Sequence, residues 1–88
     1  MTGLLLVALV ELVSEASAEY EDEVLALLPR HGGTLERRLT SGREEVQIMH
    51  FESPDGLQGF MADPDRLALR ERFGADVPAT RVLEVTPR

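Results

Sequence analysis

The sequence predicts an α+β fold whose elements run in the order strand, helix, strand, strand, helix, strand. Three observations predict it. The chain begins with an almost continuous apolar run, Leu4–Val13. A segment with one apolar stripe at helical spacing follows, and a strong helix start, Ser53-Pro54-Asp55, comes later. Between them lie two alternating segments joined by Ser41-Gly42, which is typical of an antiparallel β-hairpin.

The run Leu4–Val13 predicts a central strand that is buried on both faces. A strand with one exposed face alternates apolar and polar residues, whereas here both alternating sets are apolar except at Glu11. The set without a charge is Leu4, Leu6, Ala8, Val10 and Leu12. We therefore expect cover on both sides of this strand.

The same run has some features of a targeting or membrane segment. No Lys or Arg precedes it and Glu11 interrupts it, which is unlike a secretory signal peptide. It is also shorter than the about 20 residues that a membrane-spanning helix needs. We expect a cytoplasmic protein.

The first helix is predicted over Glu15–Arg30. Its apolar stripe is Ala16, Tyr20, Val24, Leu27 and Leu28, and the acids Glu19, Glu21, Asp22 and Glu23 are expected on its other faces. His31-Gly32-Gly33 ends it, because glycine readily adopts the left-handed conformation that follows many helices.

Two strands are predicted next, over Thr34–Thr40 and Glu44–Glu52. In the first, Leu35 and Leu39 are expected to share a face. In the second, the two faces are Val46, Ile48 and His50 against Gln47, Met49 and Phe51.

The second helix is predicted to begin at Ser53 and to be interrupted at Asp63-Pro64-Asp65, a second start signal. It continues over Arg66–Phe73 and ends at Gly74. Ala79–Thr86 is the last strand.

This order is the ferredoxin-like βαββαβ arrangement, a single domain over residues 1–88. Right-handed crossovers put the first and third strands in the centre of a four-stranded antiparallel sheet, with both helices on one face. The other face of the sheet then lacks cover. A chain of 88 residues has a marginal core, so we expect a homodimer that covers this face.

The composition limits which classes of partner and cofactor are expected. The net charge is −7, with nine arginines and no lysine, so the protein is acidic and nucleic acid and anionic membranes are not expected partners. There is no cysteine and there are two histidines, so neither a metal site nor a cofactor is expected.

The chain resembles the dimeric α/β-barrel superfamily, which includes antibiotic-biosynthesis monooxygenase-like and muconolactone isomerase-like proteins. The resemblance rests on the element order, the apolar first strand, and the segments His31-Gly32-Gly33, Phe51-Glu52-Ser53 and Phe60-Met61-Ala62-Asp63-Pro64. It implies a ferredoxin-like subunit and a barrel formed across a dimer. Oxygenases of this superfamily typically use Asn and Trp in their cavity. This chain has neither, so neither residue can be carried over and that activity loses its best support.

The candidate ligand-binding residues are Glu11, Arg38 (or its neighbour Arg37), His50 and Glu84. Glu11 and His50 are also the candidate catalytic pair, since a carboxylate beside an imidazole performs general acid–base chemistry. The structural alternative places Glu11 in water at a strand end and His50 inside a dimer interface.

Other residues have both a functional and a structural interpretation. His31 either binds a ligand at the barrel end or interacts with the helix C-terminus. One interpretation is an anion patch of Arg66, Arg70, Arg72 and Phe73; the other is a solvated helix face of Arg66 and Arg70, with Phe73 in the core. Tyr20 is either an acid or a core aromatic. Met49, Phe51, Phe60 and Met61 either line a ligand cavity or fill the core.

Three functions remain open at this point. The first is binding of a small apolar or aromatic ligand between sheet and helices. The second is a non-catalytic dimerisation or accessory module with a filled interior. The third is a cofactor-independent monooxygenase or isomerase of the same superfamily. A cavity of about 300 Å³ or more with convergent polar groups would favour the first over the second.

Overall fold

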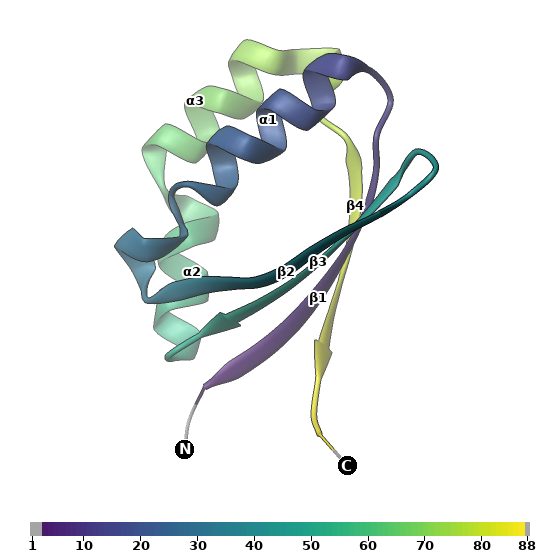
Figure 1. The fold of residues 1–88 in the computed structure, drawn as a ribbon. Helices are drawn as coiled ribbons and strands as arrows, with labels where there is room; N and C mark the ends of the chain where they lie inside the picture. Colours follow the sequence, from purple (N-terminus) through teal and green to yellow (C-terminus); the bar gives the residue numbers. More distant parts are fainter. Residues whose placement is uncertain (1–2, 88) are drawn as a thin grey trace.

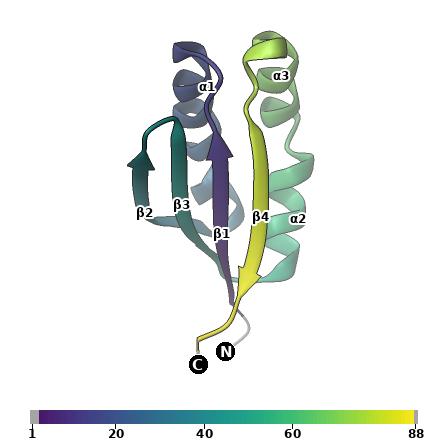
Figure 2. The same ribbon diagram turned by 90° about the vertical axis from the view of Figure 1, so that its right-hand side faces the viewer.

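Four strands form one antiparallel sheet in the order β2-β3-β1-β4, as Figure 2 shows for the computed structural model, which describes residues 3–87. The first and third strands lie in the centre, which confirms the predicted topology. The strands are β1 (Leu4–Glu11), β2 (Gly33–Ser41), β3 (Glu44–Phe51) and β4 (Ala79–Val85).

The helices all lie on one face of this sheet, and the other face is open (Figure 1). Within residues 3–87, no helix is long and apolar enough to cross a membrane. The α-helices are α1 (Glu15–Leu25), α2 (Pro54–Ala62) and α3 (Pro64–Phe73), and two 3-10 turns are η1 (Leu28–His31) and η2 (Gly74–Asp76).

Side-chain caps begin each helix where the sequence predicts. Ser14 accepts a hydrogen bond from the amide of Ser17, and Ser53 accepts one from Gly56. Asp63 does the same for Asp65. Each cap satisfies a backbone N–H that the helix itself leaves free.

The first helix is shorter than predicted, because it ends at Leu25 rather than at Arg30. Pro29 explains the difference, since its ring would clash with the carbonyl four residues earlier, which belongs to Leu25. The chain continues as the tighter turn η1. This turn ends at Gly32, whose φ of 69° is in the left-handed region.

The two alternating sets of β1 face different surroundings. Leu6, Ala8 and Val10 are 2% exposed or less and face the helices. Leu5 and Val7 belong to the other set, which lies on the open face and is only partly covered. The open face is apolar over much of its area, with Leu5, Val7, Leu9, Leu39, Val46, Ile48, Leu83 and Val85 at paired positions.

One prediction about β2 is wrong. Leu35 pairs with Met49 on the helix-covered face, whereas Leu39 pairs with Val46 on the open face. A β-bulge between Leu35 and Arg37 inserts an extra residue, so the side-chain alternation is reversed beyond it.

Candidate functional site

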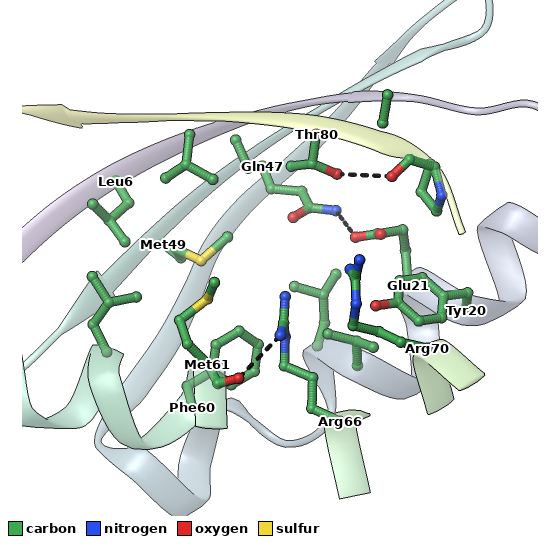
Figure 3. A pocket seen from close by; sticks show the side chains of 17 residues that line it. Leu6, Tyr20, Glu21, Gln47, Met49, Phe60, Met61, Arg66, Arg70 and Thr80 are labelled. Atoms are coloured by element: carbon green, nitrogen blue, oxygen red, sulfur yellow. Dashed lines mark hydrogen bonds between the residues drawn. The ribbon is translucent and has the colours of Figure 1, made fainter. Parts of the chain in front are cut away.

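A cavity of about 490 Å³ lies between the helix-covered face of the sheet and the three α-helices (Figure 3). Most of its wall is apolar, because the inward sets of β1 and β3 meet the inner stripes of the helices here. The apolar residues that define its interior are Leu6, Val24, Leu25, Met49, Leu57 and Phe60.

Polar side chains reach the same cavity from α1, β3 and α3. Gln47 is 2% exposed, and its amide nitrogen donates to Glu21 Oε1 at 2.7 Å and to Glu45 Oε2 at 2.6 Å. Arg66 and Arg70 extend from α3 into the same cavity (Figure 3). A few polar groups in a mainly apolar pocket is the usual composition of a small-molecule site.

The Gln47 contacts belong to a longer chain of charged groups behind the cavity. Arg38 Nε forms an ion pair with Glu45 Oε2 at 2.9 Å, and Arg38 Nη1 donates to Asp22 Oδ1 at 2.6 Å. This chain joins β3, β2 and α1. It helps to fix the orientation of Gln47, since the Glu45 carboxylate that Gln47 contacts is also held by Arg38.

Glu21 is the acid that lines the cavity, and it is only 6% exposed. Burial raises the pKa of its carboxyl, although the hydrogen bond from Gln47 acts in the opposite direction. Glu21 therefore takes up a proton more readily than an exposed glutamate. The prediction that Glu21 lies on an outer face of the helix is wrong.

Arg66 is held above an aromatic ring of the cavity wall. Its guanidinium carbon lies 5.5 Å from the centroid of Phe60, and its Nη1 donates to the carbonyl oxygen of Met61 at 3.1 Å. Its Nε is buried and has no hydrogen-bond partner within residues 3–87. A buried donor without a partner is uncommon in a folded protein.

The predicted ligand-binding residues do not lie together. Glu11 and His50 share the open face, but Glu11 pairs with Glu44 and His50 pairs with Leu5. The six-residue separation along β1 corresponds to about 20 Å. Glu11 is exposed at its end of the strand.

Arg38 and Glu84 lie on the helix-covered face instead. Arg38 pairs with Gln47 in the sheet, and its guanidinium contacts the carboxylates of Asp22 and Glu45. Glu84 pairs with Leu6 and is exposed. Neither lines the cavity. The bulge in β2 puts Arg37 on the open face, opposite Ile48.

Several aromatic and sulfur-containing residues line the cavity as one alternative expected. Met49, Phe60 and Met61 form part of its wall, whereas Phe51 is fully buried in the core. Tyr20 also borders the cavity, and its ring packs edge-on against Phe73 at 5.6 Å between centroids.

His31 is outside the cavity. Its Nε2 lies 2.7 Å from Asp63 Oδ2, and its ring packs against Phe60 at 6.2 Å between centroids. It joins the turn after α1 to the junction of α2 and α3. Within residues 3–87, no three His, Asp or Glu side chains gather in a way that could hold a metal ion.

The comparisons with known proteins concern the fold. The sequence matches no protein-family model and no curated protein. Solved structures, however, match it over nearly its whole length. A variant of SnoaB, a cofactor-independent oxygenase from Streptomyces nogalater, is 21% identical with a TM-score of 0.69, over 100% of this chain and 95% of that one.

Two further structures show the same likeness. A protein from Nitrosomonas europaea, provisionally named an antibiotic biosynthesis monooxygenase, has a TM-score of 0.75 at 14% identity, over 97% of this chain and 89% of its own. An uncharacterised NIPSNAP domain protein from Burkholderia xenovorans has a TM-score of 0.70 at 16% identity, over 97% and 94%. The ferredoxin-like fold that the sequence predicts is thus shared with these solved structures.

Proposed function

We propose that this protein binds a small apolar or aromatic molecule in the cavity between its sheet and helices. The observation that carries the proposal is the cavity itself, about 490 Å³ in volume and lined by Met49, Phe60 and Met61 beside the polar pair Glu21 and Gln47. Ligand pockets commonly have volumes of about 300–1,000 Å³ and this mixture of wall groups. A filled interior, which an accessory module would have, is not supported.

We also propose that the binding unit is a homodimer joined through the open sheet face. That face presents apolar side chains, among them Val7, Ile48 and Leu83, at paired positions of three strands. A second copy packed against it would remove this surface from water, which is the main favourable term in protein association. In such a dimer Glu11 and His50 would lie at the interface, on the opposite side of the sheet from the cavity.

The binding proposal can be tested with an uncharged dye, N-phenyl-1-naphthylamine, whose fluorescence increases in apolar surroundings. We expect saturable binding to the wild-type protein. Ala8 is 2% exposed and lines the cavity, so Ala8→Leu should weaken the binding by filling space. Ala75→Leu is the matched control, because Ala75 is exposed in η2 and outside the cavity.

Circular dichroism would establish that both variants are folded. No saturable signal from the wild type, or equal binding by folded Ala8→Leu and Ala75→Leu, would contradict the proposed site. The second result would show that the dye binds outside this cavity.

A further inference from the structure

The charge of the cavity wall is opposite in sign to that of the chain. The protein has a net charge of −7, yet two guanidinium groups, Arg66 and Arg70, line the cavity against a single carboxyl, that of Glu21. Arg66 and Arg70 are one helical turn apart on α3, so their side chains leave the helix on the same side.

These two arginines differ from others on the helix-covered side. Arg30, Arg38 and Arg72 each form an ion pair with an acid. Within residues 3–87, neither Arg66 nor Arg70 forms one. The protein therefore neutralises their positive charge less directly, although Arg66 is near enough to Glu21 to act on the pKa of that carboxyl.

Arg66 also has one edge available for an acceptor. Nη1 donates to the Met61 carbonyl, and the edge formed by Nε and Nη2 contains the buried donor without a partner, Nε. This edge of a guanidinium matches the two oxygens of a carboxylate, which it binds with two parallel hydrogen bonds.

Apolar and polar wall groups are separated along the cavity. In Figure 3, Leu6, Met49 and Phe60 lie at one end, and Glu21 and Arg70 lie at the other. Arg66 stands between the two ends. A ligand that satisfies both must have an apolar body and a polar end.

We propose that the ligand is a small organic acid whose apolar or aromatic body contacts Met49 and Phe60 and whose anionic group is bound by Arg66 and Arg70. This inference rests on the proposed function and names the class of ligand for the same cavity. Glu21 opposes an anion less than an exposed glutamate would, because burial favours its protonated, uncharged form.

The test compares two ligands of nearly the same shape, 1-naphthoic acid and the uncharged 1-naphthamide, as competitors of N-phenyl-1-naphthylamine. At neutral pH we expect the wild type to bind the naphthoate at least about tenfold more tightly, a difference of about 1.4 kcal/mol. Arg66→Gln and Arg70→Gln should each reduce this preference, and the double variant should abolish it.

Arg72→Gln is the matched control. It removes the same charge from the same helix, but Arg72 is paired with Glu23 outside the cavity, so the preference for the acid should persist. Arg70 is exposed, so its substitution tests the inference even if Arg66→Gln fails to fold.

The outcomes separate the two proposals. If the neutral dye binds but the acid and the amide compete equally, the acidic ligand is refuted and the binding function stands. If the preference survives in the folded double variant, the assignment to Arg66 and Arg70 is refuted. Failure of the neutral dye itself to bind overturns the proposed function.

Discussion

His31 and Asp63 meet at the point where α2 ends and α3 begins, with 2.7 Å between Nε2 and Oδ2. The other oxygen of this carboxylate accepts the amide hydrogen of Asp65 at 2.8 Å and so caps α3. The contact depends on a close approach of His31 to the start of α2. At Gly56 there is no room for a side chain, because an added Cβ would overlap the carbonyl oxygen of His31. The contact fixes the two helices that close the cavity.

Asp63 should make the protein sensitive to acid. The hydrogen bond from His31 is the largest cause of the lowered pKa of Asp63. A carboxyl whose pKa is lowered in the folded state contributes stability above its unfolded pKa, here 3.8, and this contribution is lost as the pH falls through the folded pKa. Asp63→Asn retains a good helix cap but not the charge, so its stability should decrease less in acid.

Urea unfolding followed by circular dichroism, from neutral pH into the acid range, measures this effect. Asp55→Asn is the control, since Asp55 is an exposed acid in the first turn of α2. Identical acid profiles for the wild type and Asp63→Asn would exclude the role assigned to this contact.

Gln47 should be important for stability although it is polar and lies in the core. Gln47→Leu keeps the approximate volume and removes the donor shared by Glu21 and Glu45. Leaving buried acceptors without a donor costs about 1–3 kcal/mol, and we expect the free energy of unfolding to fall by that amount. Gln58→Leu, an exposed position on α2, should have little effect in the same urea titration. A Gln47→Leu protein as stable as the wild type would argue against the network.

Much of the fold could be predicted from the sequence because its signals are local. The double apolar set of β1 indicated a central strand, and Ser53 and Asp63 marked helix starts that the structure confirms. Such signals depend on residues a few positions apart. They needed no knowledge of which segments pack together.

The site was less predictable because it depends on tertiary contacts. Glu21 belongs to an acidic segment, and only its partner on β3 makes burial tolerable there. Gln47 was a usable signal, since it is a polar residue in the inward set with Met49 and Phe51. The bulge in β2 had no local signal that we recognised.

Glu21 should give the protein a second pH dependence, of opposite sign to that of Asp63. Its pKa is raised by burial, so its favourable contribution is complete below its unfolded pKa of 4.5 and is lost as the pH rises through the folded pKa. Glu21→Gln cannot ionise, and its amide oxygen can still accept from Gln47. It should therefore melt at a higher temperature than the wild type at pH 7 and at a similar temperature near pH 4.

Thermal melts at both pH values test this expectation. Glu19→Gln removes an exposed acid from the same helix and provides the control for net charge. A Glu21→Gln protein that is no more stable than Glu19→Gln at pH 7 would show that burial of the carboxyl has little cost.

The open face of the sheet should hold two copies of the chain together. Val7 lies at its centre and pairs with Ile48 and Leu83, so an acid there would have only apolar neighbours in its own sheet. Val7→Asp is a sharper test than Leu9→Asp, because Leu9 pairs with Arg81, which could neutralise a new carboxylate. An unpaired charge buried in a dimer interface costs several kcal/mol, which favours dissociation.

Sedimentation equilibrium at micromolar concentration should give the wild type about twice the chain mass of 9.7 kDa, and Val7→Asp the mass of one chain. Leu67→Asp is the control, because Leu67 is an apolar residue that is 50% exposed on α3, away from the open face. It should remain dimeric. A monomeric wild type would refute the dimer, and a dimeric Val7→Asp would move the interface elsewhere. Dye binding by monomeric Val7→Asp then shows whether the cavity needs the second subunit.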